Sequence, residues 1–267
     1  MSGGYDMTEL HYDEESTRRL LVLYVTPDVV AQRAEFLAAL NPRIGERVLD
    51  VGSGPGFLAA AIAEATGPSG MVCGIDISEP LLSVARRHCA HLPWVEFRQS
   101  EVAQLPFQDH AFDAAISTQV LEYVHDVDAA LVEIHRVLRP GGRVVIVDTD
   151  WDSIVWHSPD RELTSRILAA WEQHAADIYL PRTLTRKLSR AGFCMEFQQV
   201  VPLFNPSYDP DTFSNQFIDF IVPFVIGRNG ITRDEAEGWA TDIRQAGRQG
   251  NFFFSLNRYL FVAKRCA

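Results

Sequence analysis

A nine-residue segment, Val48–Gly56, constrains the fold of this chain more than any other feature. It reads Val-Leu-Asp-Val-Gly-Ser-Gly-Pro-Gly, so a short apolar run leads directly into three glycines spaced by one residue. Glycine lets the backbone turn sharply and approach a ligand closely, and the helical pattern from Phe57 would point its N-terminus at that ligand. The segment therefore fits a nucleotide-binding turn, although by itself it fits a plain turn equally well.

Short apolar runs and helical patterns alternate over the next hundred residues. The strands expected from this pattern are 47–51, 71–75, 95–98, 114–117 and 143–147. The helical patterns between them are 57–65, 80–91, 121–123 and 129–138. Such alternation predicts a parallel sheet with helices on both faces. The strands lack a strict period of two, as expected when both faces are covered.

Helical patterns also flank this region. A helix is expected to begin at Thr26-Pro27-Asp28, which supplies an N-cap, a first-turn proline and an early acid, and to end at Asn41-Pro42. Beyond residue 148 we expect helices at 163–178, 184–191, 210–226 and 233–245, and closing strands at 196–201 and 252–263. The predicted parts are a helical cap (1–45), a core (46–150) and a third part (151–267) with an insertion (203–250), all in one globule.

Two details of the core bear on the ligand. A dinucleotide fingerprint requires a third glycine where Phe57 stands, and a P-loop requires a Gly-Lys-Ser/Thr ending that is absent. The next strand ends at Asp76, 20 residues beyond Gly56. A carboxylate there suits both hydroxyls of a ribose. A helix-capping role fits Asp76 less well, because Ser78 is the better cap for the following helix.

With these features the sequence resembles the class I S-adenosylmethionine-dependent methyltransferases, in the branch of ubiquinone and menaquinone biosynthesis (methyltransferase type 11). The resemblance covers about residues 44–148. Its motifs are 48–56, 74–78, Leu105-Pro106-Phe107, Phe112-Asp113 and 137–142. It implies an α/β fold with a doubly wound, mostly parallel seven-stranded sheet, an antiparallel last strand, N-terminal helices and a helical insertion before that strand. It also implies S-adenosyl-L-methionine as methyl donor and S-adenosyl-L-homocysteine as product.

The resemblance assigns cofactor roles residue by residue. Asp50 and the glycines would line the methionine end, Asp76 would hold the ribose, and Thr118 and Gln119 would border the sulfonium. Ile77 would pack on the adenine. Glu101 stands where the family usually has Asp before Leu-Pro-Phe and would receive the adenine amino group, and a solvated Glu101 is the alternative. The implied cofactor-binding residues are Tyr24, Asp50, Gly52, Ser53, Gly54, Asp76, Ile77, Ser100, Glu101, Val102, Thr118 and Gln119.

Methyl transfer makes modest demands on side-chain chemistry. A neutral thioether leaves, so the protein mainly has to align the nucleophile with the methyl group. A general base is needed only if the acceptor loses a proton as it attacks. The candidates that follow the fourth and fifth strands are Glu122, His125, Asp152 and His157.

Aromatic residues suggest where an acceptor would sit. Trp151 and Trp156 lie with three acids just after the fifth strand, where they would suit the wall of a pocket. The alternative is a tryptophan pair that packs the following helix. Phe217 belongs to a stripe of apolar residues at helical spacing. We expect this stripe to pack in the core, with one end forming a roof over the acceptor. Tyr12, like Tyr24, precedes the sheet and would close on the acceptor or the methionine end.

Charge and cysteine usage exclude other classes. Lys and Arg number 24 against 35 Asp and Glu, a formal net charge of −11, and no basic track for nucleic acid appears. No apolar run is long enough to span a membrane. The polar N-terminus lacks a signal pattern. Four cysteines lack metal-ligand spacing, so we expect no metal and inert thiols in a reducing cytoplasm. The predicted partner is a small-molecule acceptor, and a homodimer is left open.

Two other functions remain open at this point. A regulatory protein that binds S-adenosylmethionine without transferring the methyl group would keep Asp76 and the glycines but lack an acceptor cavity. A nicotinamide oxidoreductase is disfavoured by Phe57 in place of glycine.

Overall fold

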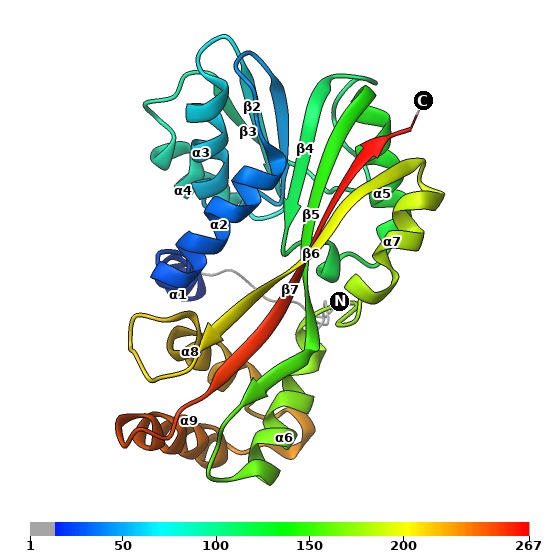
Figure 1. Cartoon of the computed structure of the whole chain (residues 1–267). Helices are drawn as coiled ribbons and strands as arrows, with labels where there is room; N and C mark the ends of the chain where they lie inside the picture. The colour runs from blue at the N-terminus through cyan, green and yellow to red at the C-terminus, as the bar shows by residue number, and fades with distance from the viewer. Residues whose placement is uncertain (1–13, 267) are drawn as a thin grey trace, which may run out of the picture.

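A computed structural model describes residues 14–266 of the chain (Figure 1). Two helices, α1 (Glu14–Tyr24) and α2 (Pro27–Leu40), precede the sheet. Thr26 is the N-cap of α2, with Pro27 in its first turn, and the helix ends at Asn41 in a left-handed conformation with φ of 48°. The predicted start and end of this helix are confirmed.

One seven-stranded sheet forms the centre of the molecule, in the order β3-β2-β1-β4-β5-β7-β6. Strands β1 to β5 pair in parallel, and β7 runs antiparallel to both β5 and β6. The strands are β1 (Arg47–Val51), β2 (Met71–Asp76), β3 (Val95–Gln99), β4 (Phe112–Thr118), β5 (Leu138–Trp156), β6 (Phe193–Asn205) and β7 (Phe254–Arg265). This architecture confirms the predicted fold class.

Helices cover both faces of the sheet because successive strand residues point to opposite sides. Val48 packs on the face covered by α2 and α3, whereas Leu49 packs on the face covered by α5 and α7. The remaining elements are α3 (Phe57–Thr66), α4 (Glu79–His88), η1 (Leu121–Tyr123), α5 (Val127–Val137), α6 (Arg161–Trp171), η2 (Glu172–His174), α7 (Pro181–Arg190), α8 (Phe213–Val225), η3 (Arg228–Gly230) and α9 (Arg233–Arg248). Apolar side chains on both faces exclude water from the strands.

Strand β5 is much longer than predicted. The segment from Trp151 to Trp156 was expected to leave the strand, but it continues β5 after an irregularity between Asp150 and Val155, and Trp156 pairs with Phe254 of β7. In Figure 1 the far ends of β5, β6 and β7 extend beyond strands β1 to β4 toward α6, α8 and α9. The prediction failed because pairing with a distant strand, not local pattern, extends β5.

The helix expected at 163–178 is also wrong in its second half. It ends as α6 at Trp171 and continues only as the single turn η2. The backbone N–H groups of Ala176 and Asp177 donate to the carbonyl oxygen of Glu122 at 2.9 and 3.0 Å instead of continuing a helix. A tertiary partner for these two donors therefore replaces the helical hydrogen bonds.

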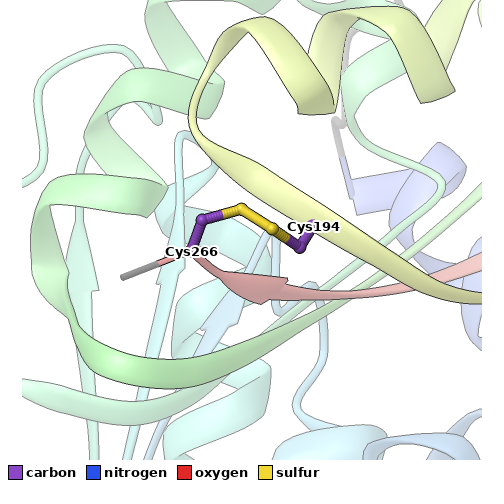
Figure 2. The surroundings of a disulfide bond; sticks show 2 residues. All are labelled: Cys194 and Cys266. Carbon is purple, nitrogen blue, oxygen red and sulfur yellow. A yellow bond between two sulfur atoms is a disulfide. The ribbon is translucent and has the colours of Figure 1, made fainter.

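Cysteine pairing corrects a further expectation. Cys194, at the start of β6, forms a disulfide with Cys266, directly after β7 (Figure 2), and their Cα atoms are 5.5 Å apart. These two residues were predicted to be free thiols. They meet because β6 and β7 are antiparallel neighbours, with Cys194 opposite Lys264. Cys73 and Cys89 are buried free thiols, as expected.

No helix between residues 14 and 266 is both long and apolar enough to cross a membrane. Over the same residues, no group of three or more His, Cys, Asp or Glu side chains is placed to hold a metal ion.

Candidate functional site

A cavity lies where β1 and β4 end, and residues of α1 and α2 form part of its lining. Its lining includes part of the predicted cofactor set, namely Tyr24, Asp50, Gly52, Ser53, Gly54, Thr118 and Gln119. It also includes residues that the sequence did not suggest, namely Val29, Arg33, Phe36, Pro55, Phe57, Leu58 and Arg258. Ligands of open α/β sheets bind at the carboxyl ends of strands, so the cavity is where the fold favours binding.

The glycine loop between β1 and α3 requires glycine for two reasons. Gly52 and Gly54 have φ of +68° and +50°, a region that side chains disfavour. A Cβ atom on Gly52 would lie 2.1 Å from Cγ2 of Val120, far inside contact distance. On Gly54 it would lie 3.8 Å from the ring of Tyr24. The loop thus packs its backbone directly against the residues that follow β4.

Asp76, at the end of β2, holds this loop in place. One carboxylate oxygen accepts a hydrogen bond from the Gly54 N–H at 2.9 Å, and the other accepts one from the Ser78 N–H at 2.8 Å. Burial raises the pKa of Asp76, and these backbone donors partly offset that effect. Ser78 caps α4, as predicted. Asp76 therefore joins the tips of β1 and β2 and retains further acceptor capacity on each oxygen.

Asp50 places an almost fully buried carboxyl group in the cavity lining. It is 1% exposed, and its Oδ2 atom has no hydrogen-bond partner within residues 14–266. Burial, together with the nearby Asp76, raises the pKa of Asp50 to about 7. The neighbouring Ser53 hydroxyl is buried and likewise lacks a described partner. Such groups fit a ligand that brings positive charge and hydrogen-bond donors.

The residues predicted for the adenine side lie outside this cavity, at the ends of β2 and β3. Ile77 is 68% exposed, and Glu101 is exposed as well. The Ser100 N–H donates to the Asp76 carbonyl oxygen at 3.1 Å, so this edge adjoins Asp76. The side chain of Val102 is buried in the core, which leaves only its backbone for a ligand. This half of the predicted site is an open surface.

Gln119 is held in an unusual backbone conformation directly after β4. Its φ is +57°, which is uncommon for a residue with a side chain and occurs often at functional sites. Its N–H donates to the Val147 carbonyl oxygen at 2.7 Å, and its Oε1 accepts a hydrogen bond from the Thr149 hydroxyl at 2.5 Å. Neighbouring β5 therefore fixes both the backbone and the side chain at the cavity edge.

Two buried acids lie behind Gln119. Glu122 accepts a hydrogen bond from the Thr149 N–H at 2.8 Å, and Asp148 accepts one from the Val120 N–H at 3.1 Å. Both residues are fully buried, and burial raises the pKa of Glu122 to about 7 and that of Asp148 well above its usual value. Among the described atoms, Glu122 Oε1 and Asp148 Oδ2 have no hydrogen-bond partner. Of the predicted bases, Glu122 has the environment that catalysis at neutral pH would use.

The structure does not bring the other predicted bases to the cavity. His125 and His157 are exposed, and neither lines the cavity. Asp152 forms an exposed ion pair with Arg182 at 2.7 Å. Their places in the sequence suggested a common site because each follows a strand, but the extension of β5 carries residues 152 and 157 away from the cavity.

The predicted acceptor residues are brought together, with one outside the described residues. Trp151 and Trp156 both stack on Phe217, with ring centroids 5.6 and 6.3 Å apart, in a buried aromatic cluster. Tyr24 packs against this cluster and also lines the cavity, so the two regions adjoin. Tyr12 lies outside the described residues.

Arg258 is the principal cavity residue that sequence reasoning missed. It is 5% exposed, and its guanidinium donates to Gln32 Oε1 at 2.6 Å. Burial lowers the pKa of Arg258, while Glu122 opposes that effect. The sequence does contain one signal for Arg258. It alternates with Phe254, Leu256 and Leu260 at every second residue of β7, and this spacing marks the inward-facing side of the strand.

Comparisons with known proteins agree with this geometry. Residues 49–146 match the model of a methyltransferase domain family. An uncharacterised 37.1 kDa protein in transposon Tn4556 of Streptomyces fradiae is 39% identical over 186 residues, which cover 68% of this chain and 52% of that protein. A demethylmenaquinone methyltransferase of Staphylococcus epidermidis is 37% identical over 117 residues, which cover 44% of this chain and 48% of that enzyme. The chain thus matches about half the length of these relatives.

The fold is also found among solved structures. The phosphoethanolamine N-methyltransferase 2 of Haemonchus contortus, solved with S-adenosyl-L-methionine, superposes with a TM-score of 0.61 at 18% identity, covering 96% of this chain and 58% of that one. Strand order, glycine loop and matched domain agree with one another. Residues 49–146 therefore match a methyltransferase domain family, and the chain shares the fold of a solved methyltransferase.

Proposed function

We propose that this protein transfers a methyl group from S-adenosylmethionine to a small-molecule acceptor and releases S-adenosylhomocysteine. One observation carries the proposal: a cavity at the carboxyl ends of β1 and β4 combines Gly52 and Gly54 with the buried, unsatisfied carboxyl group of Asp50. That combination suits a ligand with positive charge that approaches the backbone closely. When bound, the cofactor supplies an electrophilic methyl group on a positively charged sulfur.

The chain's own residues bind and orient in this proposal. Asp50 attracts the ammonium group of the methionine end, and Asp76 accepts hydrogen bonds from the ribose hydroxyls. Gln119 and Thr118 border the sulfonium, and their rigid backbone holds the methyl group in line with the nucleophile. The adenine would lie on the open edge formed by Ile77, Ser100, Glu101 and Val102.

The acceptor side of the proposal rests on the aromatic cluster and the acids beside it. Trp151, Trp156 and Phe217 would form the wall and roof that exclude water from the acceptor. Glu122 would take a proton if the acceptor loses one as it attacks, since its pKa near 7 allows it to accept and release protons at neutral pH.

Turnover tests this proposal directly. The purified protein is incubated with methyl-labelled S-adenosylmethionine and a panel of phenols, quinones, amines and polyketide-like acceptors. We expect S-adenosylhomocysteine to form only with a subset of acceptors. Binding of S-adenosylhomocysteine without turnover of any acceptor would favour the regulatory alternative, and binding of a nicotinamide cofactor instead would overturn the proposal.

Replacement of Asp76 by alanine is expected to weaken the binding of S-adenosylhomocysteine by about 1.5–3 kcal/mol, roughly 10- to 100-fold. The variant loses the proposed ribose contact and also the hydrogen bond that fixes the Gly54 N–H. Calorimetric titration measures the change. Asp242→Ala is a matched control, because this acid is exposed on α9 and lies outside the cavity lining, and it should change affinity less than threefold. Unchanged affinity in Asp76→Ala would contradict the ribose assignment.

Donor binding is expected to depend on pH through Asp50. Its pKa is about 7, so about one tenth of the carboxyl groups are ionised at pH 6 and half at pH 7. The ionised form attracts the ligand's ammonium group, which stays charged over this range. The dissociation constant of S-adenosylhomocysteine should therefore fall about fivefold from pH 6 to pH 7. Asp50→Asn should bind weakly and with no such dependence, and a constant affinity in the wild type would exclude this role.

Compartment and partners are further proposals. Charge and composition support a small-molecule acceptor without nucleic-acid binding, and they leave the choice between monomer and dimer open. The cytoplasmic location expected from the sequence conflicts with the disulfide in the structure. The Cys194–Cys266 disulfide opposes a strongly reducing compartment, because cytosolic reductants keep most thiols reduced. Thiol alkylation during cell lysis, followed by mass spectrometry, shows whether the two cysteines are bonded in the cell.

A further inference from the structure

A buried histidine beside the aromatic cluster has an unused nitrogen. His174, in η2, is 1% exposed, and its Nδ1 lies 2.6 Å from the carbonyl oxygen of Trp171. A carbonyl oxygen can only accept a hydrogen bond, so Nδ1 carries the proton and Nε2 has a free lone pair. Nε2 has no hydrogen-bond partner within residues 14–266. Buried acceptors of this kind are rare in folded proteins because leaving them unpaired costs free energy.

Another unpaired polar atom lies beside the same histidine. Its ring stacks on Trp171 at 4.1 Å between centroids and meets the ring of Trp151 edge to face at 4.5 Å. The indole N–H group of Trp171 also lacks a partner in the described chain. Trp239 in the same cluster, by contrast, donates to the Thr164 hydroxyl at 3.1 Å. The fold thus satisfies the indole of Trp239 and leaves unpaired that of Trp171, which stacks on His174.

Hydrogen bonds place this histidine next to the methyl-transfer cavity. The residues that follow His174 donate two backbone hydrogen bonds to the carbonyl oxygen of Glu122. Glu122 is joined through Thr149 to Gln119, which lines the cavity. Trp151 lies close enough to the Glu122 carboxyl group to lower its pKa, against the larger effect of burial. His174, Trp151 and Glu122 therefore form one polar group behind Gln119.

We propose that His174 is a specificity-determining residue of the acceptor site, where its Nε2 accepts a hydrogen bond from a hydroxyl group on a flat, uncharged acceptor. This inference rests on the proposed function, since it presumes a methyl acceptor at the aromatic cluster. The bond positions the acceptor's hydroxyl-bearing ring between the cluster and Gln119. It makes and breaks no covalent bond.

Three features select this ligand chemistry. The rings of Trp151, Trp171 and Phe217 offer flat apolar surfaces. The indole N–H group of Trp171 needs an acceptor, and a hydroxyl oxygen can accept from it while the hydroxyl hydrogen is donated to Nε2, which an ammonium group cannot do. Arg258 is already a buried cation close enough to interact with Glu122, so this region favours an uncharged acceptor over a second cation. Burial also lowers the pKa of His174 to about 3, so Nε2 remains an acceptor at neutral pH.

Binding of three related probes tests the inference. Ligand-observed NMR measures the dissociation constants of 2-naphthol, naphthalene and 2-naphthylmethylamine in the presence of saturating S-adenosylhomocysteine. We expect the wild-type protein to bind 2-naphthol at least tenfold more tightly than naphthalene, and the cationic amine most weakly. Tighter binding of the amine than of 2-naphthol, or equal binding of 2-naphthol and naphthalene, would overturn the inference.

Two variants separate the role of Nε2 as a hydrogen-bond acceptor from the contribution of the imidazole ring to packing. His174→Asn keeps an N–H for the Trp171 carbonyl and removes the Nε2 acceptor, so the preference for 2-naphthol should fall to less than twofold. His174→Gln extends an amide oxygen toward the Nε2 position and should keep part of the preference. An unchanged tenfold preference in His174→Asn would refute the assignment.

Donor affinity distinguishes failure of this inference from failure of the proposed function. S-adenosylhomocysteine should bind the wild type and both variants with dissociation constants within twofold of one another, because His174 does not line the cavity. Failure of the wild type to bind it would overturn the proposed function and this inference together. Normal donor binding with a probe preference that ignores His174 would overturn this inference alone.

Discussion

The Gly52→Ala variant is expected to lose at least a hundredfold in affinity for S-adenosylhomocysteine and about 2–4 kcal/mol of stability. A Cβ atom at this position would lie 2.1 Å from Cγ2 of Val120, and φ is +68°. The clash pushes the glycine loop and the segment after β4 apart, and both line or border the cavity. Calorimetric titration and urea unfolding measure the two effects.

A second glycine provides the control for backbone strain alone. Gly141 has φ of +74°, and a Cβ atom there meets nothing within 4 Å. Gly141→Ala should cost about 1 kcal/mol of stability and leave donor affinity unchanged. Val120→Ala in the Gly52→Ala background should restore part of the lost stability, because it removes the atoms in conflict. If Gly52→Ala and Gly141→Ala lose the same stability and donor affinity, close packing at Gly52 is not the cause of the losses.

Removal of the Cys194–Cys266 disulfide is expected to lower the free energy of unfolding by about 4 kcal/mol. The bond spans 72 residues of sequence that include most of β6 and all of α8, α9 and β7. In the unfolded chain it restricts a loop of this length, and the loss of that restriction stabilises the unfolded state. Urea unfolding of Cys194→Ser/Cys266→Ser against the oxidised wild type measures the difference.

Reductant separates the bond from the substituted side chains. Reduction of the wild type should lower its unfolding midpoint to about that of the double variant, and reductant should leave the double variant unchanged. Cys73 and Cys89 are buried thiols in both proteins and are common to every comparison. Equal midpoints for the oxidised wild type and the double variant would mean that the bond does not stabilise this fold.

Local sequence was sufficient for the nucleotide-binding half of the molecule. Val48–Gly56 specified a strand, a tight turn and a helix, and each of these forms as expected. The chemistry is local, because positive φ at Gly52 and helix capping at Ser78 depend on a few neighbouring residues. Alternating apolar runs then predicted the sheet, since every strand had to be covered on both faces.

Sequence reasoning was weakest where distant segments meet. The extension of β5 to Trp156 and the disulfide at Cys194 both follow from antiparallel pairing with β7, which no local pattern specifies. Asp152 and His157 looked like site residues because the end of β5 was misplaced. Arg258 and His174 were missed because each stands next to other polar residues, as exposed residues commonly do, and only packing shows that both are buried.

The sequence by itself determined the strand-loop-helix unit, the doubly wound core and the acid at the tip of β2, because backbone conformation and hydrophobic periodicity are properties of short segments. Tertiary structure alone decided which side chains share a site. It buried Glu122 behind Gln119, closed the aromatic cluster around His174 and joined Cys194 to Cys266. Packing and long-range strand pairing produce these contacts, and the disulfide joins residues that are 72 positions apart in the sequence.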